Sequence, residues 1–498
     1  MFLLLLLLHS PGFQADRKNV LLLVADDFRP NLGLYDETNQ PLFSSPHMLT
    51  PNLDRLADRS LVFDRAFCQT SMCGPSRASF LTGRRPDSTR VHGNGETFRE
   101  VGGNFTTLPG YFKQHGYRTL SSGKIFHGYH NNSKHNDFPW SWSERPFQAQ
   151  DFDIKNMSFT LFPEDFPLKD IVNTDYALEQ LRDVAPAALL GQENFFLALG
   201  IHKPHQPWDF PAPFYDLYPE DTIELPYNKY VPTGMPEMAW GDFANPRNHY
   251  WDWNNTNLGV PDLGQINVTF PDSKIKQIRR AYYASVSYMD EQMGRILRQL
   301  EDLGLADSTV IAFLGDHGFQ LGEHAQYCKW NNFEITNRVP LLVAVPGMKE
   351  SRHTDRLVEL VDLYPTLVEV AGLPVLPDCP EPSNDVEACT EGRSLAGLLE
   401  GQQEGWKTAV FYQRAYKAWS WDPELMMMAY SIRTLEGWRY TEYVHMKQAE
   451  GGSQEDRVPD WDTPADLPEL YNLGTDPWET ENLGQEQEWS QVGRMQDP

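Results

Sequence analysis

Carboxylate, imidazole and ammonium side chains follow four short apolar runs of the chain, at the point where each run ends. In chain order these sets are Asp26 and Asp27, Lys124 and His127, His202 and His205, and Asp316 and His317. In an open parallel sheet, ligands bind at the carboxyl ends of the strands. One set alone could be a turn or a helix cap, but the four sets together indicate one functional site at that edge.

Part of this set has the chemistry of a hard-cation site. Asp26, Asp27 and Asp316 offer carboxylate oxygens, which suit Ca²⁺ or Mg²⁺. Adjacent residues of a straight strand point to opposite faces, so Asp26 and Asp27 can share an ion only if the chain turns at Phe28–Pro30. His317 suits a hard cation less well, and spacing alone therefore leaves zinc open.

The segment from Cys73 to Arg84 reads C-G-P-S-R-A-S-F-L-T-G-R. It resembles the signature of the sulfatase family, which is C-x-P-S-R followed by L-T-G-R. In that family the cysteine is oxidised to formylglycine (3-oxoalanine) in the secretory pathway before folding. The resemblance therefore implies that Cys73 is modified, and that the formylglycine-generating enzyme is a partner during biosynthesis. The alternative is that Cys73 is a buried thiol with an unrelated role.

The resemblance implies a sulfuric ester hydrolase and gives each candidate residue a role. The implied ligands of one Ca²⁺ ion are Asp26, Asp27, Asp316, His317 and the modified Cys73. Arg77 and Lys124 would hold the formylglycine and the sulfate, and His127 would bond to the formylglycine hydroxyl. His205 and Lys329 would contact the scissile sulfate oxygen, and one of them would protonate the departing sugar oxygen. The hydrated aldehyde would attack sulfur and form a covalent sulfate ester, which then collapses to release sulfate.

Longer stretches resemble the family members that remove the 2-sulfate of iduronate from the non-reducing ends of heparan sulfate and dermatan sulfate. They are Phe80–Asp87, Gly200–His205, Tyr282–Tyr288 and Tyr430–Thr434. The implied partner is a sulfated glycosaminoglycan oligosaccharide, whose uronate carboxylate needs a cation of its own. Arg433 is the predicted substrate-binding cation, and the alternative is an arginine that ties two domains together. Phe319 departs from this pattern, because a tryptophan is expected at its position.

Three other functions stay open. The chain could be a sulfatase of another glycosaminoglycan sugar, or a phosphate or phosphonate ester hydrolase of the same fold. The intact signature at Cys73 argues against the phosphate and phosphonate chemistry. It could also be a secreted glycan binder without catalysis, although the presence of every expected site residue argues against that.

The charge of the chain excludes one class of partner. There are 69 acidic residues against 42 basic ones, which gives a formal net charge of -27. Nucleic acid is excluded, because phosphate backbones are bound by basic surfaces. An anionic sugar can still be a substrate if cations converge locally.

The N-terminus and the cysteines indicate secretion. Residues 1–15 begin with a leucine run that predicts a signal peptide, with a buried N-terminal strand as the alternative. No other stretch is apolar enough to span a bilayer, so no membrane contact is expected. Cys379 and Cys389 flank a Pro-rich loop and could form a disulfide or stay as two free thiols. The resemblance favours the disulfide and implies a lysosomal address. Glycosylation sequons begin at Asn104, Asn131, Asn156, Asn254 and Asn267.

The elements that must position these residues are those of a large α/β fold. Short apolar runs of the kind buried on both faces of a parallel sheet occur at 20–24, 195–199, 310–314 and 341–345, with a weaker one at 117–121. A helix is predicted from Ile275 to Leu300 by apolar residues at steps of three and four. Asp272 or Ser273 could cap its start, and Gly304 could end it.

The resemblance implies an alkaline-phosphatase-like fold, in which helices flank a large, mostly parallel central sheet. The expected organisation is a catalytic domain over residues 16–400 and a smaller α+β domain over 401–498 that completes the substrate pocket. The segment 137–170 is rich in Pro, Trp and Phe without a clear period, and it predicts a long surface loop.

Overall fold

The computed structural model describes residues 17–35, 48–127, 136–150, 157–240, 251–253, 266–402, 404–416, 427–448, 457–464 and 468–485. The expected signal peptide lies outside these ranges, as do the sequons at Asn131, Asn156 and Asn254, whereas Asn104 and Asn267 are exposed. No helix in the described part of the chain has the length and apolar character needed to cross a membrane.

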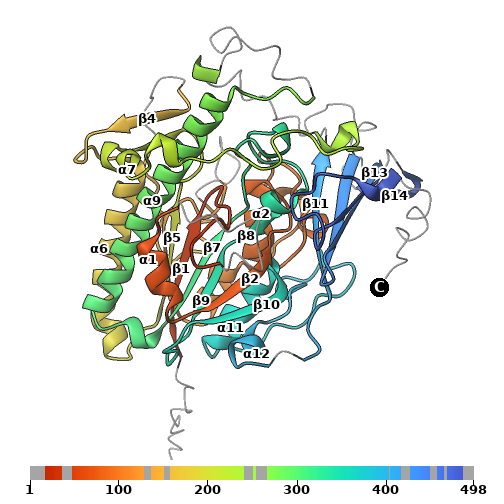
Figure 1. The fold of residues 1–498 in the computed structure, drawn as a ribbon. Coiled ribbons are helices and arrows are strands. Elements are labelled where there is room, and N and C mark those ends of the chain that lie inside the picture. The colour runs from red at the N-terminus through yellow and green to blue at the C-terminus, as the bar shows by residue number, and fades with distance from the viewer. Residues whose placement is uncertain are drawn as a thin grey trace, which may run out of the picture.

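A mixed eight-stranded sheet forms the centre of the molecule (Figure 1). Its strands lie in the order β10-β2-β9-β7-β1-β5-β3, and β8 pairs with β2. Their bounds are β1 Asn19–Ala25, β2 Leu61–Phe67, β3 Arg118–Gly123, β5 Phe195–Ile201, β7 Thr309–Gly315, β8 Arg338–Val339, β9 Leu341–Ala344 and β10 Arg352–Glu359. Strands β3, β5, β1 and β7 are parallel, and β9 is antiparallel to its neighbours. All the predicted apolar runs are strands of this sheet.

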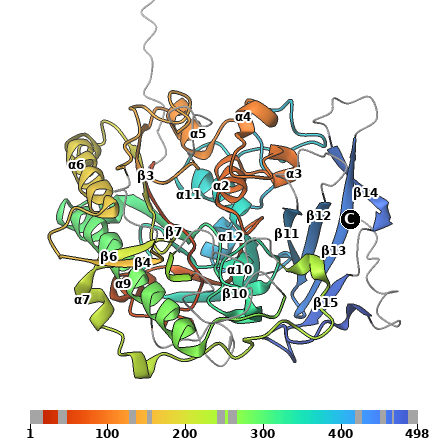
Figure 2. The ribbon, with the colours of Figure 1, turned by 90° about the horizontal axis from the view of Figure 1, so that it is seen from above.

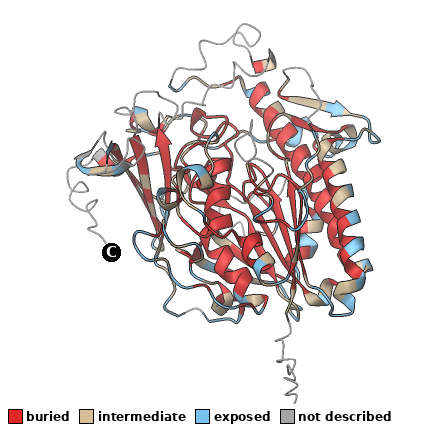
Figure 3. Ribbon diagram, turned by 180° about the vertical axis from the view of Figure 1, so that it is seen from behind, coloured by how far each residue is buried: buried red, intermediate tan, exposed pale blue. Residues whose placement is uncertain are grey.

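Helices cover both faces of the sheet. Their bounds are α1 Pro51–Ala57, α2 Cys73–Thr82, α3 Pro86–Thr89, α4 Phe98–Val101, α5 Leu108–Gln114, α6 Lys169–Leu189, α7 Ala212–Asp216, α9 Asp272–Asp302, α10 Glu334–Asn337, α11 Leu363–Val370 and α12 Ala396–Leu399. Helices α6 and α9 lie on one side, and α2, α5 and α11 lie on the other (Figures 1 and 2). The buried residues form a continuous interior that includes every central strand (Figure 3).

Strand β1 shows why a continuous apolar run predicts a strand covered on both sides. Successive side chains of a strand point to opposite faces. Leu21 and Leu23 accordingly belong to the core beneath α6 and α9, whereas Val20 and Leu22 belong to the core beneath α2, α5 and α11. Every residue of β1 is buried.

The predicted long helix is present as α9. Its buried residues include all the apolar positions of the predicted pattern. Pro271, rather than Asp272 or Ser273, is the N-cap, and no side chain caps this end. Gly304 follows the last turn with a φ of 72°, a left-handed conformation that glycine adopts at low cost.

A second, antiparallel sheet lies beside the β10 edge of the main sheet (Figure 1). Its strand order is β11-β12-β13-β14, and β15 pairs with β13. The bounds are β11 Ala409–Tyr416, β12 Met427–Thr434, β13 Trp438–Gln448, β14 Arg457–Pro464 and β15 Glu469–Asn472.

The segment expected to be one long loop is partly regular. Within 137–170, strand β4 (Phe159–Phe162) pairs in parallel with β6 (Trp208–Pro211), and α6 already begins at Lys169. The pairing partner of β4 lies far along the chain, so no local pattern could reveal it. Within this segment, residues 137–150 are irregular apart from an isolated bridge between Phe147 and Ser122.

Candidate active site

The first and seventh strands bring the predicted carboxylates together. Ala25 of β1 pairs with Gly315 of β7, so Asp26 and Asp316 leave the sheet side by side. Asp27 has a φ of 61°, which is the turn that the sequence required there. Its backbone N–H donates to Asp316 Oδ1 (3.1 Å).

Helix α9 holds this turn from one side. The Tyr282 hydroxyl donates to the carbonyl oxygen of Asp27 (2.7 Å) and accepts from the backbone N–H of Arg29 (3.2 Å). Because these bonds fix the backbone on both sides of Phe28, the turned conformation of Asp27 is held by packing and by hydrogen bonds. Helix α9 thus positions the Asp27 carboxylate, although α9 supplies none of the predicted metal ligands.

Cys73 is the first residue of α2 and lies among these groups. Its buried Sγ is 3.4 Å from Asp26 Oδ1, 3.2 Å from His317 Nε2 and 3.2 Å from Lys329 Nζ. Helix α2 is fixed to the turn after β7 by Ser76, whose hydroxyl donates to the carbonyl oxygen of Asp316 (2.6 Å). The N-terminus of a helix favours negative charge, so an oxyanion formed at residue 73 would be stabilised.

Three buried cations match the three buried carboxylates. Arg77 Nε donates to Asp316 Oδ2 (2.8 Å), and its Nη1 donates to the carbonyl oxygens of Lys124 and Ile125. The ammonium of Lys124 pairs with Asp26, and that of Lys329 pairs with Asp27. Arg77 Nη2 is buried without a hydrogen-bond partner. Its nearest carboxylate oxygen, Asp26 Oδ1, is 3.8 Å away, so this donor has the chemistry to bind an anionic group.

Burial and charge act against each other on these groups. Burial alone would raise the pKa of Asp26, but Lys124, His205, Arg77 and Lys329 hold it well below its usual range. Burial raises the pKa of the Cys73 thiol to about 12, and the neighbouring Asp26 adds to this. Cys73 therefore stays a protonated thiol at neutral pH, and an unmodified Cys73 would be a weak nucleophile.

His205 lies among the ligand atoms of this cluster, and His127 lines a cavity together with Gly74, the residue after Cys73. His205 has a ring nitrogen within 4.8 Å of ligand atoms of Asp26, Asp27 and Cys73. Its Nδ1 faces the carbonyl oxygen of Gln206, which leaves Nε2 for the site. His127 is half-buried, and burial followed by the charge of Lys124 lowers its pKa well below the usual range.

His202 is a neighbour of this cluster that the sequence did not assign a role. Its ring packs against that of His205 with centroids 4.7 Å apart, and its Nδ1 is 4.0 Å from Asp26 Oδ2. Asp170 fixes the segment, because its two oxygens accept from the backbone N–H groups of His202 (2.9 Å) and Lys203 (3.0 Å).

The donor set fits a divalent cation. Two overlapping groups, Asp26–Asp27–Cys73–His205 and Asp26–Cys73–Asp316–His317, each place their ligand atoms within 4.8 Å of one another. A cation bound among the carboxylates would neutralise the negative charges of Asp26 and Asp27, which Lys124 and Lys329 now neutralise. Both ammonium groups would then be available to an anionic substrate.

The structure does not bring Arg433 to this cluster. Arg433 lies on β12, and its Nε donates to Glu334 Oε2 (3.0 Å) at the start of α10, with both side chains buried. This ion pair joins the second sheet to the main body of the molecule. The contact supports the alternative role of Arg433, an arginine that ties two domains together, because its charge is paired with that of Glu334.

The disulfide that the resemblance favoured is present. Cys379 and Cys389 form a disulfide, whereas Cys68, Cys73 and Cys328 are free and buried. A cavity of about 190 Å³ opens beside the Cys73 end of α2, and its lining includes Gly74, His127 and Trp140.

The geometry agrees with comparisons to known proteins. The sulfatase family model matches residues 18–373, and that of the N-sulphoglucosamine sulphohydrolase C-terminal region matches 322–497. Iduronate 2-sulfatase of Mus musculus is 36% identical in an alignment of 527 residues, gaps included. The alignment covers 94% of this chain and 91% of that protein.

Solved structures share the fold at lower identity. A protein in complex with its substrate D-glucosamine-2-N,6-O-disulfate superimposes with a TM-score of 0.70 at 21% identity, covering 96% of this chain and 95% of that one. Phosphonate monoester hydrolase of Agrobacterium radiobacter gives a TM-score of 0.67 at 20% identity, with 96% and 93% covered. The fold is therefore alkaline-phosphatase-like, as expected. The family match over most of the sequence and the 36% identity show that this chain belongs to the sulfatase family and is a sulfuric ester hydrolase.

Proposed function

We propose that this sulfatase removes the 2-sulfate of iduronate from the non-reducing ends of heparan sulfate and dermatan sulfate. The observation that carries the proposal is the 36% identity to iduronate 2-sulfatase along 94% of the chain. The charge supports it, because a chain with a net charge of -27 would repel a long polyanion. Three buried cations, Arg77, Lys124 and Lys329, instead converge at one site that suits a single terminal sulfate.

The proposed nucleophile is formylglycine made from Cys73, and the proposed cofactor is one Ca²⁺ ion. When present, they supply a hydrated aldehyde whose hydroxyl is nucleophilic and a positive charge that favours its ionised form. The proposed Ca²⁺ ligands are Asp26, Asp27, Asp316, His317 and residue 73. Formation of formylglycine requires the formylglycine-generating enzyme and passage through the secretory pathway, which fits the proposed lysosomal address.

The side chains around residue 73 have distinct proposed roles. Arg77, Lys124 and Lys329 neutralise the sulfate oxygens, and the buried Nη2 of Arg77, which has no hydrogen-bond partner and lies 3.8 Å from Asp26 Oδ1, is one of the donors. Lys329 or His205 gives a proton to the departing sugar oxygen. His205 contacts the same oxygen through Nε2, and His127 accepts the proton that frees the sulfate.

The proposed domains are a catalytic unit over 16–400 and a smaller unit over 401–498 that completes the pocket. The ion pair between Arg433 and Glu334 supports a firm contact between the two. Because Arg433 pairs with Glu334, we propose that the cation for the uronate carboxylate comes from elsewhere in the pocket.

The substrate is tested by comparing kcat/KM on three disaccharides that differ in the terminal sulfated sugar. These are 2-sulfo-iduronate, 6-sulfo-glucosamine and N-sulfo-glucosamine. We expect a preference of at least about 100-fold for iduronate, because a site built for one set of polar groups rejects analogues that lack them. Preference for either glucosamine would discard the iduronate assignment and keep the sulfatase. A phosphonate monoester included as a fourth substrate tests the other activity found on this fold, and it should be hydrolysed far more slowly.

A further inference from the structure

Lys329 sits on a stretch of backbone that lacks the support of regular structure. Between the 3₁₀ turn at 323–325 and helix α10, residues 326–333 form neither helix nor strand. The next residue, Trp330, has a φ of 75°, which is unusual for a bulky side chain. Such a conformation persists only when its surroundings impose it. The backbone N–H groups of Gln320 and Gly322 donate to the carbonyl oxygens of Cys328 and Gln326, and side-chain hydrogen bonds hold the residues that follow Lys329.

Asn331 makes four of these side-chain hydrogen bonds. Its Nδ2 donates to Gln320 Oε1 (2.8 Å) and Gln326 Oε1 (3.0 Å). Its Oδ1 accepts from the backbone N–H of Phe333 (3.2 Å) and from the Thr336 hydroxyl (2.8 Å). The amide thus uses both donors and both acceptor positions while it is 1% exposed.

The backbone of Asn331 is tied to the segment that leads into Cys73. The Ser71 hydroxyl donates to the Asn331 carbonyl oxygen (2.7 Å) and accepts from the Asn331 N–H (3.2 Å). Gln320, which receives a bond from the Asn331 amide, closely follows the site residues Asp316 and His317. Asn331 therefore links the three segments that carry Cys73, His317 and Lys329.

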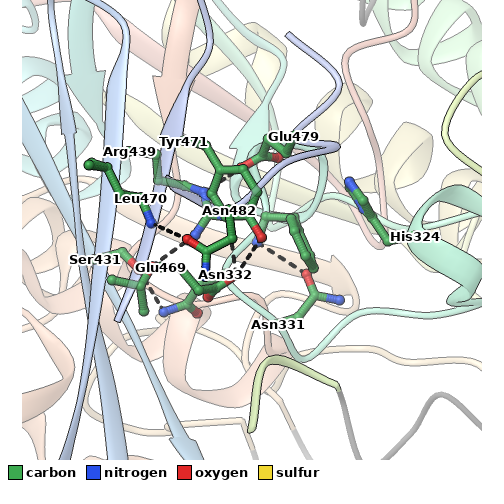
Figure 4. A network of polar contacts seen from close by, with 12 residues as sticks. His324, Asn331, Asn332, Ser431, Arg439, Glu469, Leu470, Tyr471, Glu479 and Asn482 are labelled. Atoms are coloured by element: carbon green, nitrogen blue, oxygen red, sulfur yellow. Dashed lines mark hydrogen bonds and ion pairs between the residues drawn. The ribbon is translucent and has the colours of Figure 1, made fainter. Parts of the chain in front are cut away.

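The second sheet supports the same loop from the opposite side (Figure 4). Asn332 Nδ2 donates to Ser431 Oγ of β12 (2.8 Å), and Ser431 in turn shares a hydrogen bond with Thr441 of β13 (2.6 Å). His324, Arg439 and Glu479 lie in the surrounding network. The loop is thus fixed between the two parts of the molecule.

We propose that Asn331 is a positioning residue, which places the Lys329 ammonium for its contact with the sulfate ester. The inference rests on the proposed role of Lys329. An aspartate of the same shape could not take the place of Asn331, because it would turn an acceptor oxygen toward Gln320 and Gln326. Gln320 cannot rotate to compensate, since its Nε2 is already 2.8 Å from His324 Nδ1.

A double-mutant cycle tests the proposal on the full-length enzyme. Asn331→Asp should lower kcat/KM by about 10- to 100-fold, the loss expected when a catalytic group is displaced by about 1 Å. In the Lys329→Met background the same change should cost less than about 2-fold, because it acts only through Lys329. Inorganic sulfate binding, followed by thermal shift, gives the same cycle without turnover.

Asn482→Asp is the matched control. Asn482 is also a buried amide: its Oδ1 accepts from the backbone N–H groups of Leu470 and Gly484, and its Nδ2 donates to the carbonyl oxygens of Gly234 and Pro468. None of these four partners belongs to the loop that carries Lys329. It should lower the melting temperature and leave kcat/KM of the folded enzyme unchanged. If Asn331→Asp does not fold, Ser71→Ala removes the tie to the Cys73 segment and should show the same dependence on Lys329.

Two outcomes overturn the proposal, and they are distinguishable. Equal losses from Asn331→Asp with and without Lys329 would show a general structural role and leave the assignment of Lys329 intact. Full activity of Lys329→Met would remove the proposed role of Lys329, and the positioning role of Asn331 would be lost with it.

Discussion

Replacing Arg433 by methionine separates its two possible roles. The ion pair with Glu334 spans 3.0 Å, and the two side chains are 7% and 3% exposed. Removing one partner of a buried pair costs about 3–5 kcal/mol, because the other charge is left without compensation. Glu334 keeps a second cation, Arg338, at 3.7 Å. The expected loss in unfolding free energy is therefore near the lower limit, at about 3 kcal/mol.

The assay is urea unfolding of four proteins: the wild type, Arg433→Met, Glu334→Gln and the double variant. A coupling free energy of about 1–3 kcal/mol is expected, since the residues are in direct contact. The KM for the 2-sulfo-iduronate disaccharide should change less than about 3-fold, because no uronate contact is lost. Unchanged stability together with a 10-fold or larger rise in KM would refute this reasoning and restore Arg433 as a substrate cation.

Three further changes have defined outcomes. Asp316→Asn should remove the bound metal ion, measured as metal content, because it takes a formal charge from a hard-cation site; Asp252→Asn, outside the cluster, should keep it. Burial lowers the pKa of His324 to about 4, so between about pH 6.5 and 4 the unfolded chain binds more protons than the folded one. The free energy of unfolding should therefore decrease as the pH is lowered through this range, and His324→Gln should weaken this decrease. Replacing Cys379 and Cys389 by alanine opens a loop with a sequence separation of 10 and should lower the unfolding free energy by about 3 kcal/mol with kcat retained; no change in the melting temperature would contradict this.

Local patterns were sufficient for the strands that carry the site. The run at 20–24 is apolar because β1 is covered on both faces, and such a run needs no knowledge of its partners. Asp26 and Asp316 could be placed together because each follows a strand of one parallel sheet. The turn at Asp27 could also be predicted, because Asp26 and Asp27 would point to opposite faces of a straight strand and could not share one ion.

Features that depend on distant partners could not be predicted. Strand β10 reads R-H-T-D-R-L-V-E, a polar pattern typical of a loop, and its pairing with β2 gives it a strand conformation. Asn331 bonds to Ser71 across 260 positions, and neither sequence segment marks the contact. Arg433 carries a charge that suits either a substrate or Glu334, and only the fold shows that Glu334 is 3.0 Å away.

The central claim is that residue 73 acts as formylglycine, and the mass of one peptide tests it most directly. Trypsin releases residues 66–77, which contain Cys73, and conversion lowers the peptide mass because sulfur is replaced by oxygen. Enzyme prepared with different amounts of the formylglycine-generating enzyme should contain different converted fractions. We predict that kcat is proportional to this fraction and falls to zero with it. Full activity from protein whose Cys73 is entirely an unmodified thiol would contradict the account.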